Sequence, residues 1–404
     1  MDKKGFYLMK KNIIILLLVL GVAQQSVARE CTNRTSFSNW LGQFKQEALR
    51  AGVSPRTVHS ALDGLKYSPS VIKKDRKQTH LSQNFAQFST NLVSKYRLKK
   101  GRKLMRKYRR LFRDIESRYG IPASVITAYW GLETSFGAVQ GNFNTIRSLA
   151  TLAYDCRRGE EFRPELINAL RIVDRGDLKL SEMRGAWAGE IGQTQFLPTY
   201  YLKYAVDFDR DGRRNLIKSV PDVLASTANY LKNIGWRRGH PWLEEVILPK
   251  SMPWEQTGLE NSYSLSYWAK LGVRRVNGRR LKGGLKASLL LPMGKDGAAF
   301  LAYYNFKRVY LKWNESLLYS TTAAYFATRL AGAKKVRRAR ARIASLSFSQ
   351  VKQLQRLLVR RGYDVGDIDG IIGEKTRRAV KQLQLQFRLP ADGYPTVKLL
   401  KRLR

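Results

Sequence analysis

Apolar residues recur with a helical period through the first half of the chain, from about residue 37 to residue 236. The first such run would place four apolar side chains on one face of a helix: Trp40, Leu41, Phe44 and Ala48. Residues 97–119 repeat the pattern with Lys and Arg between the apolar positions, which indicates a long amphipathic stretch with a solvated basic face; contact of that face with an anionic ligand is the alternative. Pro122 predicts the start of the next helix, because proline is favoured in a first helical turn.

The pattern changes after His240. Short runs rich in apolar, β-branched and aromatic residues predict strands at 246–248, 288–291, 300–304 and 309–311. Residues 314–330 return to a helical pattern. The chain is therefore predicted to be mainly α, of the α+β class, with a small β-rich subdomain at about residues 241–312.

Residues 331–346 and 347–404 differ sharply from each other. The first segment is a run of basic residues, which predicts a solvated linker that lets the units on either side of it move separately. The second segment contains three short helical patterns separated by Asp-Gly turns. We expect three small helices around a core of their own in this C-terminal unit.

The formal net charge of the 404 residues is +43, which indicates a polyanionic partner such as nucleic acid, an anionic membrane or a cell wall. The N-terminus narrows this choice. Four lysines precede an apolar run at 13–23, and small residues follow at Ser26-Val27-Ala28, which is typical of a secretory signal peptide over residues 1–28. A retained membrane anchor is the alternative. Export favours a periplasmic polyanion over nucleic acid and leaves no membrane span after signal cleavage.

Cys31 and Cys156 are the two cysteines of the chain. In an oxidising compartment they can form a disulfide, and two unpaired thiols are the alternative. The charged residues Arg29 and Glu30 argue against lipidation of Cys31. Only three histidines are present, without a ligand cluster or a nucleophile motif, which argues against a zinc enzyme and against a serine or cysteine hydrolase.

Residues 347–404 resemble the peptidoglycan-binding domain found at the ends of many cell-wall hydrolases. The resemblance is carried by V-K-Q-L-Q-R-L-L-V-R-R-G-Y, by D-G-I-I-G-E-K-T-R-R-A-V-K-Q-L-Q and by D-G-Y-P-T. Most of these residues would form the core and turns of such a domain. The resemblance implies that this segment binds peptidoglycan.

The preceding part, which we assign to residues 29–330, resembles the lytic murein transglycosylases of the B type. Four separated blocks carry the resemblance: A-Y-W-G-L-E-T-S-F-G from Ala128, W-A-G-E-I-G-Q-T-Q-F-L-P from Trp187, Y-A-V-D-F-D-R-D-G-R-R-N followed by A-N-Y-L, and K-W-N-E-S-L-L-Y from Lys312. It implies a lysozyme-like helical catalytic domain that needs no cofactor. It also implies cleavage of the MurNAc-GlcNAc β-1,4 bond of peptidoglycan glycan strands with formation of 1,6-anhydromuramic acid, and it is compatible with other cell-wall enzymes as partners.

Glu133 is the candidate catalytic residue. Cleaving a glycosidic bond requires an acid that protonates the leaving oxygen. Apolar neighbours such as Trp130, Leu132 and Phe136 would raise the pKa of a carboxyl group by desolvation. By itself, Glu133 could also be a surface carboxylate at a helix end. The resemblance implies that it is the sole acid and base.

The resemblance also implies a set of substrate-binding residues: Gln195, Tyr230, Asn314, Tyr319 and Arg158. Asn314 could equally be a helix N-cap, and Arg158 could be an ordinary surface charge. Ala186 departs from the family, in which a serine hydroxyl often stands at this position. That departure affects how the acid is tuned and leaves the class of reaction unchanged.

Asp207, Asp209 and Asp211 begin an acidic loop that resembles the start of an EF-hand calcium loop. Lys218 stands at the twelfth position and excludes a standard EF-hand. The family resemblance implies Asp222 as a late ligand and the carbonyl of Arg213 as another. The alternative to calcium is an Asp-Gly turn that side-chain to backbone bonds hold in place.

Two other functions remain open from the sequence. One is a non-catalytic wall-binding or scaffold protein on the same fold, against which the presence of Glu133, Gln195 and Tyr230 argues. The other is a basic nucleic-acid binder, which the interleaved basic and aromatic residues near Tyr96 would support. That function leaves the signal peptide and the C-terminal unit unexplained.

Overall fold

The computed structural model describes residue 33 and residues 35–76, 83–337 and 343–403. The predicted signal peptide, Cys31 and part of the basic linker lie outside the described residues. Helices make up most of the described chain before the sheet: α1 (Phe37–Arg50), α2 (Pro55–Leu62), α3 (Pro69–Arg76), α4 (Phe85–Leu92), α5 (Lys95–Lys107), α6 (Arg109–Tyr119), α7 (Ala123–Thr134), α8 (Thr145–Tyr154), α9 (Gly159–Asp174), η1 (Leu180–Glu182), α10 (Pro198–Tyr204) and α11 (Val220–Asn233). Two short strands, β1 (Phe143–Asn144) and β2 (Arg184–Gly185), pair antiparallel among them.

The β-rich subdomain contains one antiparallel sheet with the strand order β4-β6-β7-β3-β5. Its elements are β3 (Leu243–Ile247), η2 (Trp254–Gln256), β4 (Tyr263–Ser264), α12 (Leu265–Lys270), β5 (Arg274–Arg275), β6 (Lys286–Leu290) and β7 (Ala299–Ala302). Trp268 on α12 is fully buried against the sheet and donates from Nε1 to the Ala287 carbonyl over 2.9 Å. The subdomain therefore has a small hydrophobic core of its own.

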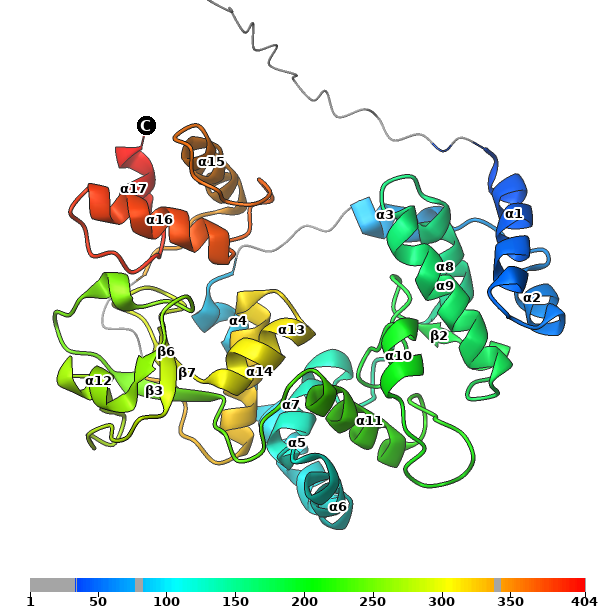
Figure 1. The fold of residues 1–404 in the computed structure, drawn as a ribbon, viewed down its shortest axis with the longest axis horizontal. Coiled ribbons are helices and arrows are strands. Elements are labelled where there is room, and N and C mark those ends of the chain that lie inside the picture. Colours follow the sequence, from blue (N-terminus) through cyan, green and yellow to red (C-terminus); the bar gives the residue numbers. More distant parts are fainter. Residues whose placement is uncertain (1–32, 34, 77–82, 338–342, 404) are drawn as a thin grey trace, which may run out of the picture.

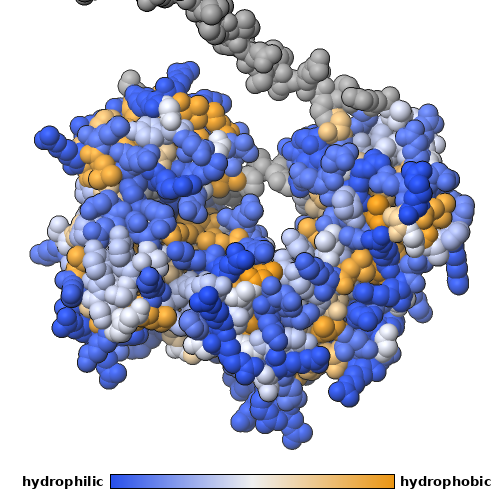
Figure 2. Space-filling view, viewed as in Figure 1, coloured by the Kyte–Doolittle hydropathy of each residue, from blue (hydrophilic) through white to orange (hydrophobic). Residues whose placement is uncertain are grey.

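The chain then returns to helix through a π-helical turn, η3 (Phe306–Tyr310), followed by α13 (Leu311–Trp313) and α14 (Leu317–Leu330). Figure 1 shows the helices α1, α2, α3, α8 and α9 on one side of the molecule and the sheet on the other. Helices α7, α11 and α14 lie between these two lobes. The space-filling view in Figure 2 is hollowed between the lobes.

Helix α7 occupies the centre of the helical part. It packs against α14, α5, α6 and α11, and all of its residues from Ser124 to Gly131 are buried. A helix that is apolar on every side is stable only when neighbours surround it. The apolar sequence of α7 thus requires the central position that the structure gives it.

Two of the sequence predictions need correction here, and a third is made more precise. Residues 309–311 are helical rather than a strand, because this apolar run is buried among helices and a short apolar run does not distinguish the two states. Residues 97–119 form two helices, α5 and α6, separated at Tyr108. Helix α14 begins at Leu317 and its N-cap is Ser316, so Asn314 is not the cap.

The C-terminal unit contains three helices as predicted, α15 (Phe348–Val359), α16 (Glu374–Gln386) and α17 (Val397–Arg402), around a separate core. Gln355 and Gln384 fix its two Asp-Gly turns. The Oε1 of Gln355 accepts from Gly370 N over 2.8 Å, and the Oε1 of Gln384 accepts from Gly393 N over 2.8 Å. These buried amides explain why glutamines stand on the inner faces of the first two helices.

The C-terminal unit is docked on the β-rich subdomain, which corrects the expectation of two separately moving units. Arg377 on α16 donates to the carbonyls of Leu291 (3.1 Å) and Pro292 (2.7 Å). Burial of this guanidinium lowers the pKa of Arg377. Lys381, one turn further along, donates to the Thr257 carbonyl and to the Glu260 carboxylate. The basic linker alone could not reveal these contacts, because they join residues far apart in the chain.

Among the described residues, no helix is both long and apolar enough to cross a membrane. Cys156 is disulfide-bonded, and its expected partner Cys31 is not among the described residues.

The docked interface predicts the effect of Lys381→Met. The substitution leaves the Thr257 carbonyl and the Glu260 carboxylate without their cation and should destabilise the interface by about 2–3 kcal/mol, since breaking a largely buried pair strands its partner. We expect a separate, earlier calorimetric transition and faster proteolysis within residues 331–346. Lys398→Met removes an exposed charge of the same unit and is the control. A single transition at the native temperature would contradict the docking.

Candidate active site

Glu133 lies at the C-terminal end of α7, immediately before the helix terminates. Ser135 and Phe136 both adopt left-handed backbone conformations, with φ of 53° and 64°. Residues other than glycine rarely adopt this conformation, and they keep it only where surrounding contacts fix it. The end of α7 is therefore a tight turn that other parts of the chain must stabilise.

Contacts from two directions hold this turn. Thr134 Oγ1 donates to the Gln193 carbonyl over 2.6 Å, and Trp130 Nε1 donates to Gln193 Oε1 over 2.7 Å. From α5, Arg97 donates to Ser135 Oγ over 3.1 Å and Lys100 donates to the Ser135 carbonyl over 3.2 Å. The second sequence block and α5 together fix the place of the glutamate.

Gly131 lets the turn fold back on the helix. A Cβ atom at this position would lie 2.8 Å from the Phe136 ring and 2.9 Å from the Phe326 ring. Both distances are shorter than a real side chain tolerates. Packing against these two rings therefore requires a glycine at position 131, two residues before Glu133, as the W-G-L-E motif has it.

The carboxylate of Glu133 accepts two side-chain hydrogen bonds on one oxygen, Oε1. Trp313 Nε1 donates over 3.1 Å, and the Tyr319 hydroxyl is the second donor. Burial raises the pKa of Glu133 from 4.5 to about 7, while the bonds from Tyr319 and Trp313 oppose that rise. The group is therefore about half protonated near neutral pH, as a general acid requires.

A second carboxyl group, that of Glu190, contributes to the same electrostatics. Its negative charge adds to the rise of the Glu133 pKa, and burial raises the pKa of Glu190 as well. The backbone of Glu190 accepts from the N–H of Ala186, the position that lacks the family's serine. Tyr319 and Trp313, rather than a hydroxyl at 186, supply the hydrogen bonds to Glu133 in this chain.

An aromatic wall adjoins Glu133. The Trp313 ring lies 4.3 Å from the Tyr129 ring and 5.0 Å from the Tyr230 ring, measured between centroids. Tyr230 stacks in turn on Tyr204 at 4.6 Å and on Tyr200 at 4.9 Å. Tyr200 is 38% exposed, so the wall reaches the surface. Stacked aromatic faces of this kind suit the apolar faces of sugar rings.

The structure places the predicted site residues at different distances from the acid. Tyr319 contacts Glu133 directly, and Tyr230 reaches it through Trp313. Asn314 follows Trp313, and its Oδ1 accepts a hydrogen bond from Ser316 N over 2.9 Å. This bond forms a turn just before α14, whose N-cap is Ser316. The reading of Asn314 as the N-cap is therefore wrong.

Gln195 and Arg158 make other contacts. Gln195 has φ of 52°, and its amide donates to the carbonyls of Gly192 (2.8 Å) and Gln140 (3.2 Å). Arg158 pairs with Glu161 at 2.9 Å and with the buried Asp75 at 3.4 Å. The positive charge of Arg158 also opposes the rise that burial causes in the pKa of Glu190. Arg158 is thus anchored in an ion-pair cluster beside the site rather than being a free surface charge.

Sequence reasoning missed two residues. Trp313 lies within the K-W-N-E block, immediately before the predicted Asn314, and its indole contacts Glu133. Gln193 is the first glutamine of G-Q-T-Q-F, and it holds the end of α7 while its Nε2 donates to the Ile217 carbonyl over 3.0 Å. The quoted motifs contained both residues, but their spacing alone did not indicate which side chains face the acid.

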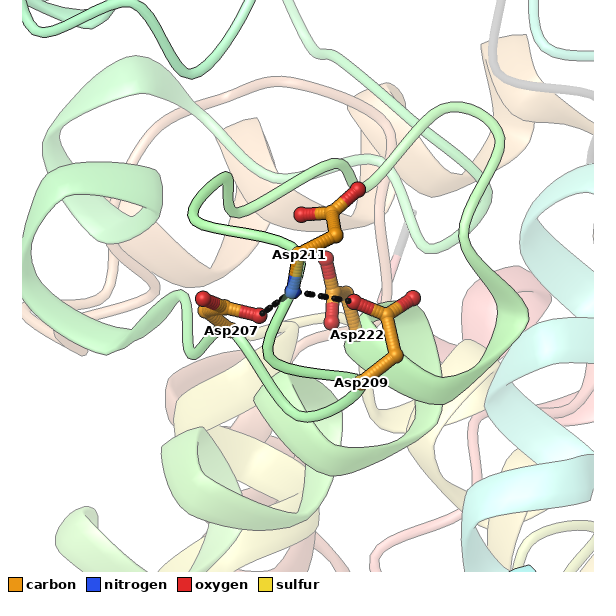
Figure 3. Close-up of side chains that lie close together, drawn as sticks. All are labelled: Asp207, Asp209, Asp211 and Asp222. Carbon is orange, nitrogen blue, oxygen red and sulfur yellow. Dashed lines mark hydrogen bonds between the residues drawn. The ribbon is translucent and has the colours of Figure 1, made fainter.

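The four aspartates of the acidic loop converge as predicted (Figure 3). One carboxylate oxygen from each of Asp207, Asp209, Asp211 and Asp222 lies within 4.8 Å of the others. Asp222 is fully buried and accepts from Phe208 N and Asn215 N, each over 2.7 Å. Burial raises its pKa to about 6.

Two arginines that would oppose a cation in this loop are neutralised elsewhere. Arg213 donates to the Glu182 carboxylate over 2.8 Å and to the Asp177 carbonyl over 2.9 Å. Arg214 pairs with Asp177 at 3.1 Å. The loop is also held by its own bonds, since Asp211 N donates to Asp207 over 3.1 Å and to Asp209 over 3.3 Å. The four carboxylate oxygens are suitable ligands for a hard cation such as calcium. The backbone hydrogen bonds are equally expected of the alternative, a turn without a cation.

Comparison with known families is consistent with this geometry. Residues 36–328, more than half of the chain, match the model described as Transglycosylase SLT domain. This chain belongs to the transglycosylase SLT family. Residues 348–403 match the model of a peptidoglycan binding domain. Both matches agree with the two resemblances seen in the sequence.

Several solved and curated proteins resemble this SLT-family chain. The crystal structure of SltB3 from Pseudomonas aeruginosa in complex with NAG-anhNAM-pentapeptide is 42% identical with a TM-score of 0.86, and the match covers 92% of this chain and 100% of that one. The Escherichia coli lytic transglycosylase Slt35 in complex with calcium is 27% identical with a TM-score of 0.61, covering 72% and 92%. Membrane-bound lytic murein transglycosylase B of Escherichia coli (strain K12) is 38% identical over 157 residues, which span 38% of this chain and 42% of that protein.

The raised pKa of Glu133 predicts a pH-dependent cost to stability. The folded protein keeps a proton that the unfolded chain releases between pH 4.5 and about 7, so stability falls as the pH rises through that window. Glu133→Gln keeps an acceptor for Trp313 and Tyr319 but carries no charge. At pH 8 this variant should be more stable than the native protein by about 2–3 kcal/mol, and at pH 4 the two should agree. Denaturant unfolding at both pH values measures this, and an equal difference at both would contradict it.

Proposed function

We propose that this protein is a lytic transglycosylase that cleaves the MurNAc-GlcNAc β-1,4 bond of peptidoglycan without water. The observation that carries the proposal is the Glu133 carboxyl, which burial keeps partly protonated near neutral pH at the end of α7 beside an aromatic wall. Membership of the SLT family and the relative solved with NAG-anhNAM-pentapeptide support it. A non-catalytic scaffold would gain nothing from retaining so costly a buried acid.

Glu133 would act twice in the reaction. As the acid, it donates its proton to the glycosidic oxygen, and the bond from muramic acid C1 to that oxygen breaks. As the resulting carboxylate, it then takes the proton of the C6 hydroxyl, whose oxygen attacks C1 and closes the 1,6-anhydro ring. The hydrogen bonds from Tyr319 and Trp313 stabilise the carboxylate between the two steps.

The remaining predicted residues would hold the glycan strand. Tyr230 is buried and would act through Tyr200, which stacks on it and is exposed enough to offer an aromatic face to a sugar ring. Gln195 and Asn314 would bind sugar hydroxyl or acetamido groups. Arg158, held by Asp75 and Glu161, would face an anionic lactyl or stem-peptide group. No cofactor takes part in this chemistry.

We also propose a division of the chain that follows from this function. Residues 1–28 would direct export to the periplasm, residues 29–330 would carry catalysis, and residues 347–404 would bind the wall. The docked interface supports a refinement, because it holds the wall-binding unit at a fixed place relative to the catalytic part. The basic segment between them would then be a connection rather than a hinge.

The central prediction concerns Glu133→Gln on purified sacculi. The native protein should release muropeptides that end in 1,6-anhydromuramic acid and resist borohydride reduction, as mass spectrometry can show. The variant should lose roughly a thousandfold or more of this activity, because the amide cannot supply the proton. Glu160→Gln, the same change at an exposed position on α9, should retain activity. Reducible products would identify a hydrolase, and activity of Glu133→Gln within a few-fold of native would refute the assignment.

We further propose that the acidic loop binds calcium through Asp207, Asp209, Asp211 and Asp222, with the Arg213 carbonyl as a fifth ligand. The convergence of the four carboxylates supports this, as does the related Slt35 structure solved with calcium. The cation would stabilise the loop that joins the Gln195 segment to α11, which carries Tyr230. Its role would be structural.

Calcium at several millimolar should raise the melting temperature of the native protein, because it binds the folded state only, and a chelator should reverse the rise. Asp211→Ala should abolish the shift. Asp367→Ala, an exposed aspartate of the C-terminal unit, should leave it unchanged. An unmoved native melting curve would favour the turn held by its own hydrogen bonds.

A further inference from the structure

An open groove of about 720 Å³ lies where α5 and α6 meet the start of α7. Its lining is dominated by guanidinium groups, those of Arg102, Arg106, Arg109, Arg113 and Arg238. The region around α5 and α6 is strongly hydrophilic on the face shown in Figure 2. The proposed reaction uses none of these residues.

Four of the arginines, here called the arginine row, come from α5 and α6. Arg102 and Arg106 lie four residues apart on α5, and Arg109 and Arg113 lie four residues apart on α6, so each pair shares one face of its own helix, and both pairs line the groove. Arg238 adds a fifth guanidinium from outside these helices. An anionic surface or chain, rather than a single small ion, matches five guanidinium groups that line one open groove.

The carboxylate of Glu116 also lines the groove, but among the described residues none of the five guanidinium groups forms an ion pair with it. Arg102 donates to the Arg329 carbonyl over 2.7 Å, and Arg238 donates to the Glu116 carbonyl over 3.2 Å. Both side chains are thus fixed by neutral backbone groups. Within the described part of the chain, the one ion pair made by the five is a 3.8 Å contact between Arg113 and its exposed neighbour Asp114.

Apolar atoms separate the guanidinium groups. Met105 and Phe112 lie on the same face of the helices as the arginine row, and Ala123 adds a third small apolar surface. Phe112 is buried, while Met105 is half-buried. A ligand that fills this groove therefore presents both negative groups and apolar atoms. Exposed aromatic rings for base stacking, which single-stranded nucleic acid would use, are not part of the lining.

We propose that this groove binds the phosphate headgroups of anionic phospholipids and holds the protein at a membrane surface. Guanidinium groups bind phosphate oxygens in a bidentate manner. The adjoining glycerol and acyl carbons would contact the half-buried Met105, as in basic amphipathic helices that lie on anionic membranes. A net charge of +43 favours the same partner over a zwitterionic surface.

The placement leaves the active site free. Ala123 begins α7 and lines the groove, whereas Glu133 lies ten residues further along the same helix. The two sites are therefore separated by roughly 15 Å along a rigid helix. Membrane attachment through the groove would hold the acid at a fixed height above the lipid surface, where glycan strands could reach it.

The test compares two triple variants of the full chain with equal loss of charge. Arg106→Gln, Arg109→Gln and Arg113→Gln remove the exposed part of the row. Arg279→Gln, Arg280→Gln and Lys282→Gln remove three exposed charges of the β-rich subdomain. Binding is measured by vesicle sedimentation at about 0.15 M salt, where long-range attraction is screened. The vesicles contain phosphatidylcholine alone or with phosphatidylglycerol.

The native protein should bind the anionic vesicles and not the zwitterionic ones. The groove variant should lose about a hundredfold in affinity, at roughly a factor of five for each of the three arginines. The control variant should stay within a few-fold of native, and all three proteins should melt alike and release muropeptides at equal rates. Equal losses in the two variants would show attraction by net charge alone and overturn the proposal.

Two further measurements distinguish a phospholipid headgroup from a free phosphate and from the cell wall. Soluble glycerol phosphate at millimolar concentration should not displace the vesicles, and full displacement would indicate a site for a free phosphate. Binding to purified sacculi should be equal for the native protein and the groove variant. A loss on sacculi with unchanged vesicle binding would assign the groove to the wall and also overturn the proposal. Because muropeptide release is measured separately, failure here leaves the proposed reaction standing.

Discussion

The burial of one carboxyl group, that of Glu133, is the constraint on which the rest of the structure depends. A charged carboxylate in this position is costly, and the chain offsets the cost in part with two donors on one oxygen, Trp313 and Tyr319. Both donors come from the region of α13 and α14, at the far end of the helical part in sequence. Segments nearly two hundred residues apart in sequence must therefore come together before Glu133 is buried and hydrogen-bonded.

The β-rich subdomain and the C-terminal unit are placed so that the helices around Glu133 can still meet. The subdomain is inserted between α11 and η3, so the helices on both of its sides return to the centre of the molecule. Its outer surface then carries the C-terminal unit, with Arg377 and Lys381 reaching backbone carbonyls of the subdomain. Two of the many basic side chains thus join the C-terminal unit to the subdomain, by donating hydrogen bonds to neutral carbonyls and to one carboxylate.

Other cations serve at helix ends and in local clusters. Arg238 and Arg102 donate to carbonyls near the C-termini of α6 and α14, where the helix dipole favours positive charge. Arg213 and Arg214 turn away from the acidic loop toward Asp177 and Glu182, which leaves the four aspartates facing one another. The excess of basic residues is thereby divided between structural positions and an outer surface that remains free to attract anions.

The sequence by itself determined the helical class, the three-helix C-terminal unit, the acidic loop and the identity of Glu133 as the candidate acid, because each rests on local periodicity or on a contiguous motif. It misplaced residues 309–311 as a strand and took Asn314 as a possible cap, because short apolar runs and single polar residues fit several local structures. Only the tertiary structure decided that Trp313 contacts the acid, that Gln193 holds the end of α7 and that the C-terminal unit is docked. These contacts join residues between about sixty and two hundred positions apart in sequence, where periodicity carries no information about which side chains meet.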